Sequence, residues 1–272
     1  IHIAGTSGKT STAHYAAALL QAEGQRVGLL TSPHVEKITE RIRINLQPLS
    51  DRLFCDELAL FLELVEQSGI KLTYAEVLYA MGYWEFARQH VSYMVIETGL
   101  GGLLDATNVI NRPDKVCIIT DIGLDHTNVL GNTLAKIAEQ KAGIIRQRNQ
   151  VFMYRQSPEI MTAITHATGK VQAVLHLVTP RYSDTYTFLP LFQRRNFGLA
   201  SEAVKYIALR DGLPRLTAKQ VQAAAYTSIP ARMERIPVGK KTLIIDGAHN
   251  TQKLQALRES IASQFTGQRS AL

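Results

Sequence analysis

A glycine-rich segment near the start of the chain contains residue types that bind phosphate. Gly5–Ser11 reads Gly-Thr-Ser-Gly-Lys-Thr-Ser and lies between a strand pattern and a helix pattern. Glycines let backbone N–H groups surround phosphate oxygens, and a helix N-terminus adds a favourable dipole. We expect Lys9 to reach the β- and γ-phosphates of a nucleotide, and Thr10 or Ser11 to hold Mg²⁺. The candidate nucleotide-binding residues of this loop are Gly5, Thr6, Ser7, Gly8, Lys9, Thr10 and Ser11.

Three further polar residues follow or end apolar, strand-like stretches: Ser32, Glu97 and His126. Ligand sites in doubly wound sheets lie at the carboxyl ends of the strands. A carboxylate such as Glu97 can hold a hard cation beside phosphates. A single histidine is more often a structural residue, and Mg²⁺ prefers oxygen ligands, so His126 is the weakest candidate on chemistry alone.

Strand and helix patterns alternate along most of the chain, which predicts an α/β fold with a doubly wound, mostly parallel sheet. The expected strands are Ile1–Ala4, Val27–Thr31, Tyr93–Glu97, Val116–Thr120, Val151–Tyr154 and Val171–Val178. The expected helices are Thr10–Glu23, Ser50–Gln67, Thr73–His90, Thr133–Ala142, one from Ser157, Gln193–Arg210 and Thr217–Tyr226. Ser50 and the pair Thr73 and Glu76 have helix-capping positions, and Gly143 is a helix stop.

A linker at Ser228–Pro230 divides the chain into residues 1–227, an ATP-binding domain, and residues 228–272. After the linker we expect a strand at Thr242–Asp246 and a helix at Gln252–Phe265. One strand and one helix cannot bury a core of their own. We therefore expect 228–272 to be the beginning of a second α/β domain that is incomplete.

The composition of the 272-residue chain restricts its partners. Its net charge of +7 favours anions such as nucleotides, phosphates or polyglutamate. The Lys and Arg residues are scattered, so we do not expect nucleic-acid binding. Cys55 and Cys117 are far apart and are expected to be buried thiols, which fits the reducing cytoplasm. No apolar stretch is long enough for a membrane span.

The short phosphate loop resembles that of the Mur ligase superfamily, in which Gly-Thr-Asn-Gly-Lys precedes small hydroxyl residues; here Ser7 replaces the asparagine. Other segments resemble the folylpolyglutamate synthase/dihydrofolate synthase branch: Thr31–His34, Glu40–Ile42, Glu97–Asn108, Gln140–Ile144, Gln193–Asn196, Ala231–Glu234 and Asp246–Asn250. Three positions depart from the pattern of that branch. Leu103 replaces an arginine, Gln140 a glutamate and Phe192 a histidine.

The resemblance implies a metal site that holds two Mg²⁺ ions. Ser32 and Glu97 would bind the first ion, and Glu97 and His126 the second. Lys141 would be carbamylated, which turns a cation into an anionic group near the second ion. The alternative for Lys141 is a solvated residue at a helix end, where the helix dipole favours a cation.

The resemblance also implies contacts to the nucleotide. Asn196 would lie near the adenine, and Arg232 would reach the γ-phosphate from the second domain. Asp246 and His249 would approach the ribose and the phosphates across the cleft. Asn250 could instead serve only as a helix cap.

The activity that the resemblance implies is ATP-dependent ligation of L-glutamate to a folate-type carboxylate, either tetrahydrofolate or dihydropteroate, by a monomeric enzyme. The acceptor carboxylate would attack the γ-phosphate, and the glutamate amine would attack the resulting acyl phosphate. Three alternatives stay open: a Mur-type peptidoglycan ligase, a nucleotide-binding fragment without turnover, and a generic P-loop ATPase. The short loop spacing disfavours the last, and the segments Thr31–His34 and Glu97–Asn108 disfavour the first.

Overall fold

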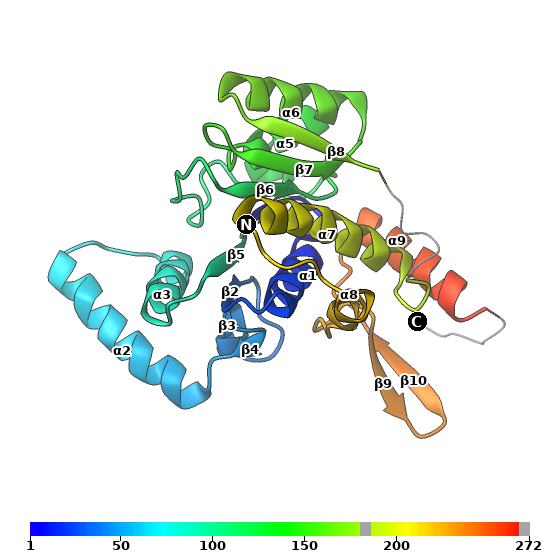
Figure 1. Cartoon of the computed structure of the whole chain (residues 1–272), viewed down its shortest axis with the longest axis horizontal. Helices are drawn as coiled ribbons and strands as arrows, with labels where there is room; N and C mark the ends of the chain where they lie inside the picture. Colours follow the sequence, from blue (N-terminus) through cyan, green and yellow to red (C-terminus); the bar gives the residue numbers. More distant parts are fainter. Residues whose placement is uncertain (180–185, 267–272) are drawn as a thin grey trace.

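The computed structural model describes residues 1–179 and 186–266, and an eight-stranded sheet forms its centre (Figure 1). The strand order is β4-β3-β2-β5-β1-β6-β7-β8. The strands are β1 (His2–Ala4), β2 (Val27–Leu30), β3 (Ile42–Ile44), β4 (Gln47–Pro48), β5 (Tyr93–Glu97), β6 (Val116–Ile119), β7 (Gln150–Tyr154) and β8 (Val174–Val178).

The six strands from β2 to β8 in this order are parallel, whereas β3 and β4 add an antiparallel edge. After β1 the chain adds β2 and β5 on one side of β1, and later adds β6, β7 and β8 on its other side, so the strand order reverses at β1. In open α/β sheets, ligands bind at such a reversal, outside the carboxyl ends of the strands. The predicted doubly wound, mostly parallel sheet is therefore confirmed, and the loops after β1, β2, β5 and β6 meet at one edge.

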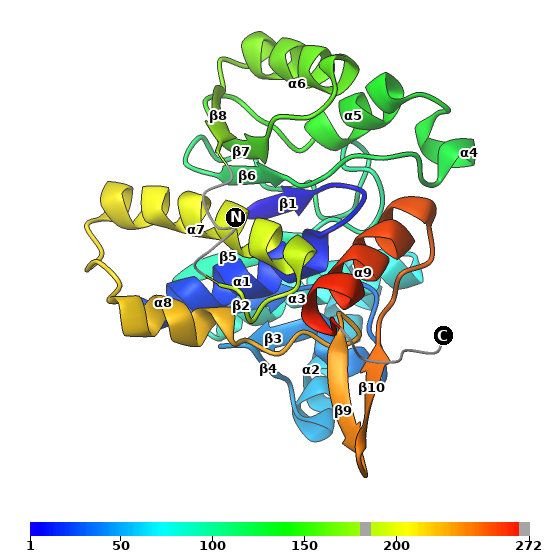
Figure 2. The same cartoon turned by 90° about the vertical axis from the view of Figure 1, so that its right-hand side faces the viewer.

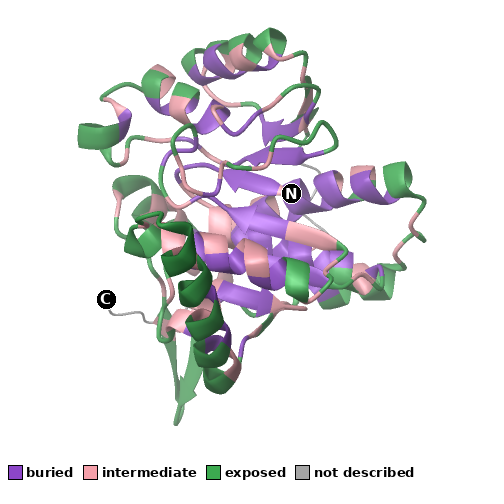
Figure 3. Cartoon of the chain, turned by 90° about the vertical axis from the view of Figure 1, so that its left-hand side faces the viewer, coloured by how far each residue is buried: buried purple, intermediate pink, exposed green. Residues whose placement is uncertain are grey.

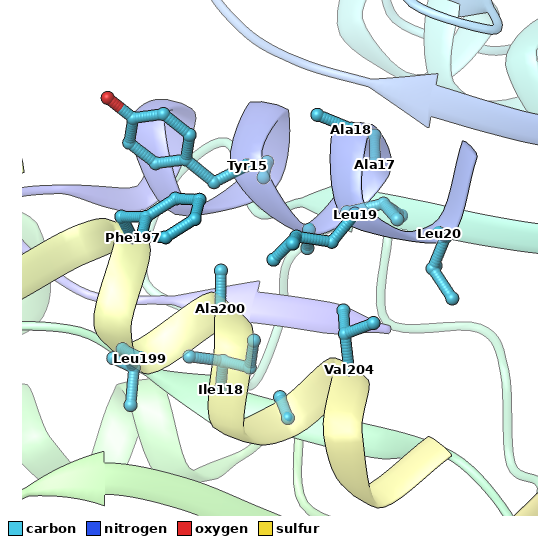
Figure 4. Close-up of a cluster of buried hydrophobic side chains, with 14 of the residues drawn as sticks. Tyr15, Ala17, Ala18, Leu19, Leu20, Ile118, Phe197, Leu199, Ala200 and Val204 are labelled. Carbon is cyan, nitrogen blue, oxygen red and sulfur yellow. The ribbon is translucent and has the colours of Figure 1, made fainter. Parts of the chain in front are cut away.

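Helices α1 (Lys9–Ala22), α7 (Leu191–Asp211) and α8 (Ala218–Ala225) cover one face of the sheet. Tyr15 of α1 and Phe197 of α7 meet edge to face, with ring centroids 5.2 Å apart, and Ile118 of β6 belongs to the same core cluster (Figure 4). Aromatic pairs in this geometry contribute beyond their buried area. This packing holds α1 against the sheet and so fixes the position of the glycine-rich loop that leads into the helix.

The opposite face is covered by α3 (Tyr74–Arg88) and, over the other half of the sheet, by α5 (Leu134–Ala142) and α6 (Pro158–Lys170). Alternation within the strands sends Ile118 to the first face and Cys117 and Ile119 to the second. Helix α2 (Asp51–Ser68) is mostly exposed (Figure 3). The short helices are η1 (Ile38–Arg41) and α4 (Thr127–Leu130).

Residues after the linker form a hairpin of β9 (Glu234–Val238) and β10 (Lys241–Ile245), followed by α9 (Thr251–Gln264). The predicted strand and helix differ from β10 and α9 by one residue at each end, and β9 was not predicted. Helix α9 lies beside the N-terminal end of α1 (Figure 2). The division of the chain into 1–227 and 228–272 stays a prediction.

Some sequence expectations need correction or lie outside the description. The expected burial of both cysteines is wrong for Cys55, which is exposed on α2, while Cys117 is buried and both are free. The sequence also has a polar stretch, Thr179–Thr187, after the strand expected at Val171–Val178, and most of this stretch lies outside the described residues. Among those described, none of the helices combines the length and apolar character that a membrane crossing needs.

Candidate active site

A cavity of about 680 Å³ lies at the carboxyl edge of the sheet. Its walls come from the loops after β1, β2, β5 and β6, from α5 and α7, and from the turn before β9, the loop after β10 and the start of α9. All of the predicted site residues line it, although they are distributed from Gly5 to His249 in the sequence. The topology therefore brings the dispersed motifs to one place.

The glycine-rich loop is held in a specific conformation. A Cβ at Gly5 would lie 1.7 Å from Thr120 Oγ1, and Gly8 has φ +90, a left-handed value that favours glycine. The backbone N–H groups of Thr6 and Ser7 donate to the carbonyl oxygen of Asp121, at 2.8 and 3.1 Å. The amides at the start of α1 are therefore the groups of this loop that can receive phosphate oxygens.

Two lysines converge on one carbonyl oxygen of this loop. Lys9 Nζ donates to the Gly5 oxygen at 3.1 Å, and Lys141 Nζ donates to the same oxygen at 2.9 Å. Burial, reinforced by the charge of Lys9, lowers the pKa of Lys141 to about 7. Lys141 is therefore a buried amine near the phosphate loop and not a solvated residue at a helix end.

Glu97 ends β5 as a buried carboxylate. It accepts hydrogen bonds from Thr10 Oγ1 at 2.8 Å and from the Ser32 backbone N–H at 3.2 Å. The Ser32 hydroxyl in turn accepts from Tyr79 at 3.1 Å. Burial raises the pKa of Glu97, and the charge of Lys9 opposes this rise. Of the two hydroxyls that the sequence left open, Thr10 is the one that contacts the carboxylate.

The oxygen atoms around Glu97 suit a hard cation such as Mg²⁺, because carboxylate and hydroxyl oxygens are its usual ligands. Ser11 is buried beside Thr10 in the first turn of α1. His126 is exposed at the start of α4, where its Nε2 lies 3.9 Å from Asp125. Within residues 1–179 and 186–266, no three His, Cys, Asp or Glu side chains gather as a metal site.

Arg232 reaches the phosphate loop from the segment after the linker. Its Nη2 lies 3.4 Å from Thr10 Oγ1, so it also lies beside the carboxylate of Glu97. Asp246 accepts the backbone N–H groups of Met233 and Ala248, both at 2.8 Å, which ties the Arg232 turn to β10. Burial raises the pKa of Asp246. Asp246 thus positions Arg232 in addition to lining the cavity.

Two other predicted residues lie in the cavity wall. Asn196 of α7 is buried, and a Cβ at Gly8 would lie 2.4 Å from its Oδ1. Asn196 therefore packs directly against the phosphate loop. His249 is exposed, and its Nδ1 donates to the Gly247 carbonyl oxygen at 2.7 Å.

Several residues of this site were not predicted from the sequence. Asp121 holds the phosphate loop, and Tyr79 orients Ser32. Gln252 and Lys253 enter the cavity from the first turn of α9. Only Lys253 carried a usable signal, because it lies three residues after the capping Asn250 and so on the same helix turn. The others depend on contacts between segments far apart in the sequence.

These features define a class: an α/β nucleotide-binding protein in which a C-terminal segment contributes an arginine to a phosphate loop. The Mur ligase middle domain matches residues 3–175. Folylpolyglutamate synthase from Lacticaseibacillus casei is 32% identical over 98% of this chain and 68% of its own length. The chain therefore belongs to the Mur ligase family and, within it, to the folylpolyglutamate synthase group.

Solved structures agree with this assignment. Mycobacterium tuberculosis folylpolyglutamate synthase complexed with ADP and AMPPCP is 33% identical, with a TM-score of 0.83 over 96% of this chain and 66% of that chain. An FPGS–AMPPCP–folate complex is 28% identical, also with a TM-score of 0.83, over 98% and 71%. The chain spans between 49% and 68% of the length of the curated relatives that it matches.

Proposed function

We propose that the protein is an ATP-dependent ligase that adds L-glutamate to the carboxylate of a folate-type acceptor. The observation that carries this proposal is the meeting of Arg232 with Thr10 and Glu97 in one cavity. Related structures hold AMPPCP alone or with folate, which supports both a nucleotide and a pterin substrate. The two free cysteines fit the reducing cytoplasm that the sequence predicts.

In this proposal the nucleotide phosphates bind at the N-terminus of α1. The amides at the start of the helix receive phosphate oxygens, and Lys9 leaves the Gly5 carbonyl to reach the β- and γ-phosphates. Asn196 borders the bound nucleotide on the α7 side. Asp246 and His249 border it on the side of the C-terminal segment.

Thr10, Ser32 and Glu97 would hold Mg²⁺ beside the phosphates, with Ser11 supporting the same turn. The oxygen-rich donor set fits the preference of this ion. When bound, Mg²⁺ would offset phosphate charge during transfer. A second ion between Glu97 and His126 stays a prediction, because the His126 side chain is exposed and its Nε2 lies 3.9 Å from Asp125.

The reaction needs no nucleophile from the protein. The acceptor carboxylate attacks the γ-phosphate of ATP, which breaks the bond to ADP and leaves an acyl phosphate. The glutamate amine then attacks the acyl carbon, and phosphate leaves. Lys9 and Arg232 stabilise the negative charge that develops on the transferred group.

Lys141 is suited to carbamylation, as the resemblance predicts. Burial keeps its amine largely able to react at neutral pH, since its pKa is lowered to about 7. A neutral amine attacks carbon dioxide, whereas an ammonium group has no lone pair. The carbamate nitrogen retains one N–H, which can still donate to the Gly5 carbonyl oxygen.

Phosphate release with Mg-ATP and glutamate tests the proposal, with and without dihydropteroate or tetrahydrofolate. We expect release that requires a pterin acceptor and is lost in Lys9→Ala. A peptidoglycan-precursor acceptor serves as the control for the Mur-type alternative. Nucleotide binding without acceptor-dependent release would contradict catalysis by this chain and support the nucleotide-binding fragment instead.

A further inference from the structure

Lys253 is a cation in the cavity that the proposed reaction does not use. It lies in the first turn of α9 and is half-buried in the cavity wall. Its Nζ lies 3.1 Å from His249 Nε2. Because His249 Nδ1 carries its proton toward Gly247, Nε2 is the acceptor in this contact. The ammonium group of Lys253 therefore bonds to an uncharged partner.

Hydrogen bonds hold the first turn of α9 against the phosphate loop and the loop after β6. The Ser7 hydroxyl donates to Gln252 Oε1 at 2.9 Å, and Asn250 Nδ2 donates to Asp125 at 2.9 Å. Asn250 also caps the helix, accepting the Lys253 backbone N–H at 2.9 Å. These contacts hold the backbone of Lys253 next to the phosphate loop.

The electrostatic surroundings of Lys253 are unfavourable for a cation. A helix N-terminus carries partial positive charge, which repels a lysine there. Burial lowers the pKa of Lys253, and the charge of Lys9 lowers it further, while Asp125 opposes these effects. The two carboxylates that act on Lys253, Asp125 and Glu97, already accept hydrogen bonds from other groups.

A positive side chain in such a place is stabilised when an anion joins it. Lys9 and Arg232 lie close enough to act on Lys253, so three cations from two segments converge on one cavity. Converging cations at a helix N-terminus form a binding site for a polyanion.

We propose that Lys253 binds oxygens of the terminal phosphate of the nucleotide, from the side opposite the phosphate loop. When the nucleotide binds, the Lys253 ammonium group donates to a phosphate oxygen in place of His249 Nε2. Helix α9 then contacts the nucleotide directly through this side chain. The inference rests on the proposed nucleotide site and adds a contact from the C-terminal segment to it.

Nucleotide affinity measured by calorimetry tests this role. Lys253→Met keeps most of the stem and removes the charge, and Lys241→Met removes an exposed lysine of β10 as the matched control. We expect Lys253→Met to bind AMPPCP about tenfold more weakly, as for the loss of one charge-assisted hydrogen bond. Its ADP affinity should fall by less than about threefold, and Lys253→Arg should recover most of the AMPPCP affinity.

Unchanged AMPPCP affinity in Lys253→Met would overturn the proposal. Equal losses for AMPPCP and ADP, with a lower melting temperature than Lys241→Met, would overturn it too, because they indicate a structural role. The measurement needs no turnover. A failure of the ligase assay would therefore count against the proposed function, whereas the nucleotide affinities of the Lys253 variants could still be interpreted.

Discussion

The carbonyl oxygen of Gly5 accepts hydrogen bonds from two lysine side chains, and both lysines have a role in the proposed reaction. Lys9 and Lys141 approach it from α1 and α5, at 3.1 and 2.9 Å. The burial of Lys141 and, after it, the repulsion between the two lysines lower the pKa of Lys141 and favour the loss of its proton. The site thus contains a lysine whose protonation state is coupled to the phosphate loop.

This coupling predicts a pH-dependent stability. The pKa of Lys141 is about 7 in the folded protein and about 10.5 when the chain is unfolded. Between these values the unfolded state binds the extra proton. The free energy of unfolding should therefore rise with pH across this window, by at most about 1.4 kcal/mol per pH unit. As the pH falls from 10.5 toward 7, this gain in stability disappears.

Denaturant titrations of the wild type and Lys141→Met, in bicarbonate-free buffer from pH 6 to about 10.5, measure this contribution. The difference in stability should move in favour of the wild type as the pH rises. Parallel pH profiles for the two proteins would show that Lys141 is not desolvated. Added bicarbonate should flatten the wild-type profile alone, because a carbamate does not take up that proton.

At the residue scale, the sequence identified groups whose role is set by local context. Lys9 follows a glycine loop, and Glu97 ends a strand, so their placement at the sheet edge follows from the pattern. The choice between Thr10 and Ser11 needed the structure, because both are on the same helical turn. Asp121 and Tyr79 could not be found, since each acts through a partner remote in the sequence.

At the scale of elements, capping signals located the helices well. Ser50 caps α2, and Thr73 with Glu76 forms the predicted capping box of α3. Strands β3, β4 and β9 were missed for physical reasons, and β3 has only three residues, too few to show a pattern. Strand β4 has two residues and contains Pro48, and β9 is almost entirely exposed and contains Pro237, a residue that argues against a strand.

The phosphate loop leads directly into α1, and glycine variants at the two ends of this helix test whether nucleotide binding depends on the loop conformation. The variant after the helix controls for the general cost of alanine at a left-handed φ. Gly8 and Gly24 both have left-handed φ values, +90 and +80. Alanine at either position should cost about 1–2 kcal/mol of stability. Only at Gly8 would the new Cβ meet a neighbour, Asn196 Oδ1 at 2.4 Å, whereas Gly24 has nothing within 4 Å.

We therefore expect Gly8→Ala to weaken AMPPCP binding by at least about tenfold, and Gly24→Ala to leave it unchanged. Fluorescence titration of the nucleotide with both variants measures this. Equal affinities would mean that the loop does not need the observed conformation to bind phosphate.

At the scale of the whole molecule, the site is shared between the sheet and the segment after the linker. Arg232 contacts Thr10, and Gln252 contacts Ser7, so groups far apart in the chain form one cavity. The sequence predicted the fold of the sheet because strand and helix patterns are local. It could not predict how α9 docks, because that depends on long-range contacts.

The central claim is that an acceptor carboxylate takes phosphate from ATP before glutamate attacks. The most direct measurement uses a pterin acceptor whose reacting carboxylate carries a heavy isotope at both oxygens, followed by mass spectrometry of the released phosphate. Because phosphate leaves with the oxygen that bridged it to the acyl carbon, we predict one heavy oxygen per phosphate. Unlabelled phosphate, or AMP and pyrophosphate in place of ADP and phosphate, would contradict the account.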